Sequence, residues 1–481
     1  MQNLFDKFFR KGYNIIDERS QFLKGGGLLI TDLTKGKPSS LLWRFTLPLL
    51  ISIIFQQMYN ICDSVIAGNY AGATPADGEL ALAAVGASYP VTMLFIQIAN
   101  GINSGCAVVI SQLFGAKEYV RMKTAVSTSL ITTMILAAIL TVAGLFCCDP
   151  IMTALHTKPE IFDDSALYLR IYIAGLIFLF LYNICTGIFT ALGDSKTPLI
   201  FLIASSIGNI ILDLIMVIPL QMGVAGVAWA TFIAQGISAI LAAVTLFFRL
   251  KKIETPHRSP RFSNHMLRTI SRIAIPTICQ HSFVSVGNLL IQGLVNDMGP
   301  AILAGYSAAI KLNTFAVNII SCISNGVSSF TAQNIGAEKP ERIPSGYKSG
   351  FAFTVICLIP FWIGYLVFAD SMIGFFSKEP SAEALGAGAS FLRAAAPFYA
   401  ILGVKLISDG VLRGAGAIRS FMASTFSDLL LRVVIAYILV PFMGFAAFLW
   451  AWPIGWVLSA GLAAFFYFRG NWKNASFKIS H

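Results

Sequence analysis

The chain has 481 residues, of which 56% are hydrophobic and 12% are charged, with a mean hydropathy of +0.74. This composition excludes a water-soluble enzyme, because soluble domains carry about 25% charged residues. The net charge of +11 would suit a nucleic-acid-binding protein, but the basic residues lie between apolar segments and form no basic domain. We therefore predict an integral membrane protein.

Apolar segments recur along the chain, each near the roughly 20 residues that cross hydrocarbon as a helix. The short alternating segments of a membrane β-barrel are absent. We therefore predict an all-α integral membrane protein with twelve transmembrane helices. In chain order the predicted spans are 42–66, 83–110, 124–147, 166–189, 199–220, 223–248, 270–293, 302–328, 348–368, 391–412, 421–441 and 445–468.

The basic residues orient these helices. Most of the 34 Lys and Arg lie on one side of the predicted topology, which contains residues 1–40, the 249–269 linker and residues 469–481. The positive-inside rule assigns this side to the cytoplasm. We therefore expect a plasma-membrane protein with both termini in the cytoplasm, whose basic residues contact anionic membrane lipids and not nucleic acid.

The sequence contains an internal duplication. Residues 82–121 and 303–342 align at a constant shift of 221, and GIFTALGDSK at 187–196 parallels GVLRGAGAIR at 410–419. Each copy holds six predicted helices, an even number, so both copies enter the membrane in the same orientation. Two parallel six-helix repeats predict two lobes around a central cavity, related by a pseudo-two-fold axis along the membrane normal.

The duplication sets the expected domain organisation. We assign an N-terminal extension to residues 1–40, an N-lobe to 41–248, a linker to 249–269, a C-lobe to 270–468 and a tail to 469–481. Two such lobes suit alternating access by rocking of one lobe against the other. A channel would more often be an oligomer with a repeated filter sequence, which the chain lacks.

Two aspartates, Asp63 and Asp213, lie inside otherwise apolar stretches of the first half. A carboxylate at mid-bilayer is disfavoured by roughly 2.5–3.5 kcal/mol on insertion scales. A residue this costly is more often retained for handling ions or substrates than for packing. The second half lacks both acids, so we expect the functional carboxylates in the N-lobe.

Several segments carry a family resemblance. Pro48 is followed by QQMYNICDS at 56–64, and GIFTALGDSKTP at 187–198 precedes GNIILD…GVAGVAWAT at 208–231. With the duplicated SQLFGAKE and TAQNIGAE segments, this order resembles the multidrug and toxic compound extrusion (MATE) family, above all its bacterial DinF/MepA-like branch. The resemblance implies a monomeric twelve-helix antiporter, not an enzyme, which exports small organic cations or amphipathic drugs. It implies coupling to an H⁺ or Na⁺ gradient and no further cofactor or metal.

The family's N-lobe cation site carries over onto Asp63, Asn209, Asp213 and Thr231. Asn209 and Asp213 are four residues apart, so they share one helical face. Two carboxylates, an amide and a hydroxyl form an oxygen-only set, which suits Na⁺ or protons equally. The alternative for Asn209 and Thr231 is ordinary hydrogen bonding between helices.

Helix 1 supplies two further candidates. Pro48 removes a backbone hydrogen bond, and the resemblance implies that it hinges the helix; a static kink is the alternative. The resemblance also implies that polar groups line a substrate cavity in the first lobe. For each of these groups, packing between helices is the alternative function; they are Gln56, Tyr59, Asn60 and Asn183.

The second half departs from the first in its charges. We match Asp428 and Arg432 to Asn209 and Asp213, and their i,i+4 spacing predicts an intrahelical salt bridge. Lys311 and Lys405 also lie within predicted spans. We expect Lys311 to extend toward the interface or to pair with an acid such as Asp428 or Asp409, or else to titrate during transport.

Two other functions remain open. A lipid-linked saccharide flippase of the same superfamily would need a basic cavity for its pyrophosphate cargo, which Lys311, Lys405 and Arg432 would supply. An integral-membrane prenyl transferase would need Asp-rich motifs in cytoplasmic loops. The only adjacent acidic pair of aspartates, Asp163 and Asp164, falls in a predicted extracellular loop, which disfavours the enzyme.

Overall fold

The computed structural model describes residues 31–70, 75–155, 157–376, 381–470 and 472–473. Within these ranges all regular structure is helical. Eleven described helices are long and apolar enough to cross a membrane, or twelve if α5 and α6, which meet at a bend of 47°, form one span. The predicted all-α membrane fold is confirmed.

Each sequence half contributes one helical bundle. The first half contains α2 (Pro38–Tyr70), α3 (Pro75–Gly115), α4 (Tyr119–Ala154), α5 (Pro159–Ala174), α6 (Leu176–Ala191), α7 (Lys196–Val217) and α8 (Gly223–Lys252). The second half contains α9 (Asn264–Asn296), α10 (Pro300–Gly336), η1 (Pro340–Arg342), α11 (Ile343–Val367), α12 (Ala369–Gly374), α13 (Ala382–Ala395), η2 (Ala396–Phe398), α14 (Tyr399–Ala415), α15 (Ile418–Met443) and α16 (Ala446–Phe468).

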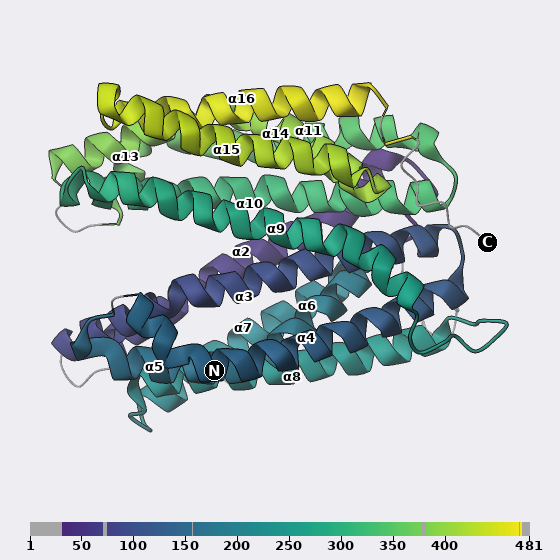
Figure 1. The fold of residues 1–481 in the computed structure, drawn as a ribbon, viewed down its shortest axis with the longest axis horizontal. Coiled ribbons are helices and arrows are strands. Elements are labelled where there is room, and N and C mark those ends of the chain that lie inside the picture. Colours follow the sequence, from purple (N-terminus) through teal and green to yellow (C-terminus); the bar gives the residue numbers. More distant parts are fainter. Residues whose placement is uncertain (1–30, 71–74, 156, 377–380, 471, 474–481) are drawn as a thin grey trace, which may run out of the picture.

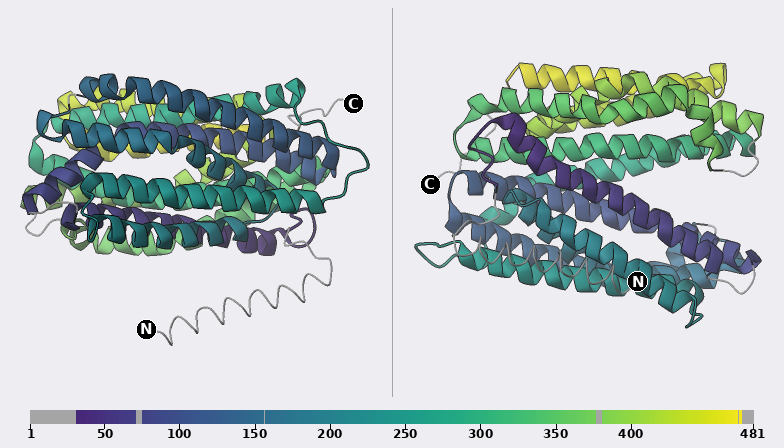
Figure 2. Two further views of the ribbon diagram at one scale, coloured as in Figure 1. Left: turned by 90° about the horizontal axis from the view of Figure 1, so that it is seen from below. Right: turned by 180° about the vertical axis from the view of Figure 1, so that it is seen from behind.

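The two bundles meet at one end of the molecule and splay apart toward the other. Figures 1 and 2 show the bundles diverging toward the end where α5 and α13 begin. The opposite end, which we call the closed end, also holds the linker: Lys123, near the start of α4, donates a hydrogen bond to the Ile253 carbonyl at 2.6 Å. The fold therefore has one open and one closed end.

The first helix of each half crosses between the bundles. In α2, Leu42 and Phe45 are buried in a core with residues of α10, α11 and α14 from the second half. In α9, Ile270 and Ile273 are buried in the core of the first half. The start of α2 therefore packs in the second bundle and the start of α9 packs in the first. The predicted lobe boundaries, which divide the chain by sequence, do not show this exchange.

Pro48 and Pro276 lie at the corresponding points of α2 and α9. In each helix the segment before the proline packs in the opposite bundle, whereas a later segment packs in its own, as Ile66 and Ile291 do. A proline cannot donate the helical hydrogen bond at its position. The location is what a hinge between the bundles requires, and the hinge role of Pro48 stays a prediction.

Backbone landmarks recur with the duplication. Gly193 and Gly416 end corresponding helices with φ of 81° and 84°, and Gly223 and Gly444 both have φ of 54°. Only glycine adopts this region without strain, so these turns fix the register of the repeats. The offset is 223 residues at the first pair and 221 at the second.

Candidate functional site

Three predicted cation-site residues lie on two helices that pack together, α7 and α8. Asp213 is completely buried and Asn209 is 3% exposed, both on α7. Thr231 is half-buried on α8, and α7 packs directly against α8. Farther along, the Ser205 hydroxyl of α7 donates to the Ala234 carbonyl of α8 at 3.4 Å. With this antiparallel pairing, Thr231 lies opposite the turn of α7 that holds Asn209, one turn before Asp213.

An apolar layer lies one turn from these polar residues, on the side of the α7–α8 connection. Its members Ile66, Val217 and Val227 are buried in one cluster. Val217 follows Asp213 by one turn of α7, and Val227 precedes Thr231 by one turn of α8. Ile66 likewise follows position 63 by about one turn of α2. Because Ile66 packs against Val217, the backbone at position 63 lies at the level of Asp213. The side chain of Asp63 itself lies outside the described residues.

This arrangement has the chemistry of a site for a small cation. A buried carboxylate beside an amide and a hydroxyl presents oxygen ligands of the kind that hard cations prefer. Burial also favours the protonated form of a carboxyl group, so the same residues suit a proton. The apolar layer separates these oxygens from the open end.

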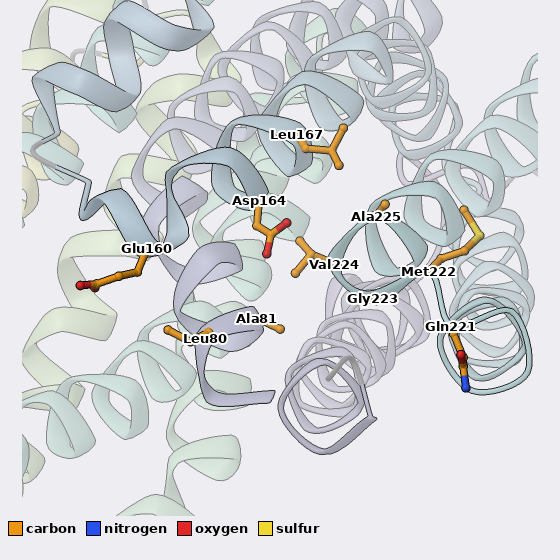
Figure 3. A pocket seen from close by; sticks show the side chains of 10 residues that line it. All are labelled: Leu80, Ala81, Glu160, Asp164, Leu167, Gln221, Met222, Gly223, Val224 and Ala225. Atoms are coloured by element: carbon orange, nitrogen blue, oxygen red, sulfur yellow. The ribbon is translucent and has the colours of Figure 1, made fainter. Parts of the chain in front are cut away.

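A pocket of about 260 Å³ lies beyond this layer, at the start of α8. Figure 3 shows its lining, which includes Glu160, Asp164 and Gln221. Glu160 and Asp164 are exposed. Asn209, Asp213 and Thr231, the cation-site residues whose side chains are described, do not line this pocket, so the described cavity and the polar set are separate features.

Two of the four predicted substrate-cavity residues, Gln56 and Asn183, have side chains that the structure describes. The amide nitrogen of Asn183 donates to the Leu179 carbonyl of its own helix at 2.8 Å. Gln56 is exposed on α2, and the side chains of Tyr59 and Asn60 lie outside the described residues. This bond is local to α6, and the cavity role of Asn183 stays a prediction.

The second half contains a buried charge cluster. Lys405 on α14 lies 3.4 Å from the Asp409 carboxylate and 3.5 Å from that of Asp428 on α15. The Ser424 hydroxyl donates to Asp409 at 2.8 Å. The prediction of an Asp428–Arg432 salt bridge is wrong, because Asp428 faces α14 and pairs with Lys405. The Arg432 guanidinium lies 4.2 Å from the Trp452 ring centre instead.

Lys311 takes no part in this cluster. Its side chain is exposed, and its ammonium lies 5.8 Å from the Phe376 ring centre. Among the described residues it forms no ion pair, so the expected pairing with Asp428 is wrong. The lysine that pairs with Asp428 is the buried Lys405. Sequence spacing did not predict this pair, because the two residues lie on different helices, α14 and α15, whose faces meet only in the folded bundle.

The repeat register also corrects our matching of the two halves. Asn209 corresponds to Arg432 when counted from Gly193 and Gly416, and to Leu430 when counted from Gly223 and Gly444, whereas the match made on sequence was Asp428. Counted from Gly223 and Gly444, Trp452 corresponds to Thr231. The region of the C-lobe that corresponds to the N-lobe polar set therefore contains Arg432, whose guanidinium lies over the Trp452 ring.

The closed end holds residues that the cation-site reasoning missed. The side-chain amide of Gln112 donates to the Gly414 carbonyl, and that of Gln333 donates to the Ala191 carbonyl, both at 2.9 Å. Each bond joins one bundle to the other, and the two are related by the duplication. The signal was present in the repeated SQLFGAKE and TAQNIGAE segments, but only the structure shows that each glutamine bonds across the bundles.

Comparisons with known proteins agree with this architecture. The MatE family model matches residues 48–215 and 276–438, once in each half. "Probable multidrug resistance protein YpnP" of Bacillus subtilis is 28% identical over 92% of this chain and 97% of its own length. "Multidrug export protein MepA" of Staphylococcus haemolyticus is 24% identical over 88% and 91%.

Solved structures share the fold. A structure described as the outward-facing conformation of a multidrug resistance MATE family transporter superposes with a TM-score of 0.84, at 23% identity, over 93% of this chain and 99% of that one. The matches cover both halves, the order of the helices and the duplication. The chain therefore belongs to the MATE family of membrane transporters.

Proposed function

We propose that this transporter is a secondary active antiporter that exports amphipathic, often cationic organic compounds in exchange for H⁺ or Na⁺. The observation that carries the proposal is Asp213, a fully buried carboxyl group inside a membrane-spanning helix, with Asn209 one turn away. A carboxylate at such depth is disfavoured by roughly 2.5–3.5 kcal/mol. A bound cation or proton that neutralises it lowers the free energy of the occupied state.

We expect Asp63 to supply this site with a second carboxyl group and the means for exchange. Two neighbouring carboxyl groups titrate as a coupled pair, so their combined negative charge depends on whether ions are bound. A negative site attracts a cationic compound, and the entering ion removes that attraction. Alternation between ion and cargo is the requirement for antiport.

The orientation of the molecule supports export. The closed end carries the basic 249–269 linker, which the positive-inside rule assigns to the cytoplasm. We accordingly place both termini in the cytoplasm of a monomer in the plasma membrane. The bundles then diverge toward the outside, and cargo leaves from the state that the structure describes.

The pairing of Lys405 weighs against a flippase for pyrophosphate-linked saccharides, although the buried Arg432 has no carboxylate partner among the described residues. Such a cargo needs uncompensated positive charge. Lys405 is matched by two carboxylates within 3.5 Å, those of Asp409 and Asp428, and Lys311 is exposed on α10 outside any described pocket.

The test is drug export under an imposed Na⁺ or proton gradient, measured as efflux from right-side-out vesicles or as uptake into inverted vesicles. We expect Asp213→Asn and Asp63→Asn each to lower the efflux rate at least tenfold with unchanged membrane expression. Asp164→Asn is the matched control, because this acid is exposed at the outer end of the same lobe. The gradient that sustains wild-type export identifies the ion. Wild-type rates in both site variants would contradict the proposal.

A further inference from the structure

Residues 31–36, which we call the strap, precede α2 and run across the closed end from one bundle to the other. The backbone N–H of Thr31 donates to the Gly193 carbonyl of the first half at 3.3 Å. Two residues later, Leu33 is completely buried in a core formed with the second half. The strap therefore contacts both bundles within three residues.

The first-half contact is shaped to the strap backbone. Gly193 has a φ of 81°, and a Cβ atom added there would lie 2.2 Å from the Thr31 carbonyl oxygen. Only a residue without a side chain allows this approach. The α6–α7 turn thus fits the strap closely.

The second-half contact is made through the closed-end glutamine. The side-chain oxygen of Gln333 accepts a hydrogen bond from the Leu33 N–H at 3.1 Å, while its nitrogen donates to the Ala191 carbonyl. The neighbouring Asn334 donates to the Leu33 carbonyl at 3.2 Å. One buried amide therefore joins the strap, the second half and the first half.

Two basic residues hold the rest of the strap. Lys339 donates to the Thr34 carbonyl at 3.2 Å, and Arg342 donates to the Gly36 carbonyl at 2.8 Å. Arg342 is itself held by the Asn334 side chain at 2.9 Å. The bonds from Lys339 and Arg342 to the strap both go to its backbone carbonyls, so they fix the path of the strap and depend little on its side chains.

We propose that the strap is an intramolecular latch that holds the closed end shut and must detach before this end opens. The two bundles cannot part while Thr31 is bonded to one of them and Leu33 to the other. Detachment of the strap then favours the state with the bundles parted, because a contact made only in the closed state stabilises that state alone. The amino-terminal segment thereby sets the balance between the two states, whichever ion couples transport.

The test measures how often the closed end opens. Ala332 is a suitable reporter position, because it lies on α10 yet is fully buried in the core of the first half. We would introduce Ala332→Cys in the full-length chain with its eight native cysteines replaced, and measure the rate of modification by a hydrophilic maleimide in nanodiscs. Modification requires the bundles to part, so its rate follows the open fraction.

Leu33→Ala removes the buried anchor, and truncating such a leucine should raise the modification rate about tenfold or more. Arg342→Gln removes one surface bond to the strap without altering a core residue, and should raise the rate by a smaller factor. Lys35→Ala is the matched control within the strap, because its side chain is 71% exposed and pairs only with Asp32. Its rate should equal that of the parent.

Parent-like rates in both Leu33→Ala and Arg342→Gln would overturn the proposal. Equal acceleration by Lys35→Ala would also overturn it, since the effect would then not depend on the contacts between bundles. The readout contains no transport step, so this result is separate from the test of the proposed function.

Discussion

The closed end makes a sharp prediction for Gly336→Ala. A Cβ atom at Gly336 would lie 1.9 Å from the Gln112 carbonyl oxygen, and one at its repeat mate Gly115 would lie 2.1 Å from the Gln333 carbonyl oxygen. Ordinary contacts of this kind begin near 3.4 Å. The obstructing atoms belong to the backbone of helices, so the bundles themselves must separate at this point, by about 1–1.5 Å.

The free-energy change follows from this displacement. Overpacking of a tight contact costs about 1–3 kcal/mol, and the higher helix propensity of alanine returns up to about 1 kcal/mol. The separation also lengthens the bonds of Gln112 and Gln333, which are 2.9 Å in the structure. A net loss of about 1–2 kcal/mol from the closed state raises the ratio of open to closed molecules about 5- to 30-fold.

The assay is the distance between spin labels on the two bundles. Glu118 and Glu341 are exposed at the closed end, one in each half, and suit labelling after substitution by cysteine. Gly336→Ala should increase the population with a long distance. Gly461→Ala is the matched control, because a Cβ atom there meets no other heavy atom within 4 Å. The same distance distribution in both variants would refute the reasoning.

Three further predictions concern the buried charges and the hinge. Lys405→Met leaves two buried carboxylates without their partner and should lower the free energy of unfolding by about 3–5 kcal/mol. Its control, Arg170→Met, breaks an exposed pair and should change the free energy of unfolding by less than about 1 kcal/mol. Equal shifts in the melting temperature of the two variants would contradict this difference. Double-mutant cycles should give a larger coupling energy between Lys405 and Asp428 than between Asp428 and Arg432. A larger coupling energy for Asp428 and Arg432 would instead support the intrahelical salt bridge. Pro48→Ala allows the missing helical hydrogen bond to form and should slow transport while preserving the melting temperature; unaltered transport would favour a static kink.

The N-lobe polar set shows how far sequence reasoning extends. The i,i+4 spacing of Asn209 and Asp213 predicts their common face, because neighbours on one helix follow from helical geometry alone. The same reasoning failed for Asp428 and Arg432, where a residue from another helix offered Asp428 a partner. Spacing reports contacts within a helix, whereas α14 and α15 meet only when the bundle packs.

The closed end shows a different limit. The two copies containing Gln112 and Gln333 were visible as a duplication, but a repeat does not reveal which residues of one copy touch the other. The strap is a still clearer case, because residues 31–36 bond mainly through backbone atoms and leave no pattern of side chains in the sequence.

The sequence by itself determined the membrane-spanning helices, the six-plus-six duplication and the acids of the N-lobe, because hydrophobic length, internal similarity and the cost of a buried charge are local properties. Tertiary structure alone decided the partner of Asp428, the exchange of the first halves of α2 and α9 between the bundles, and the latch at the closed end. These features depend on which helix faces meet, and the packing of the whole membrane bundle sets those faces.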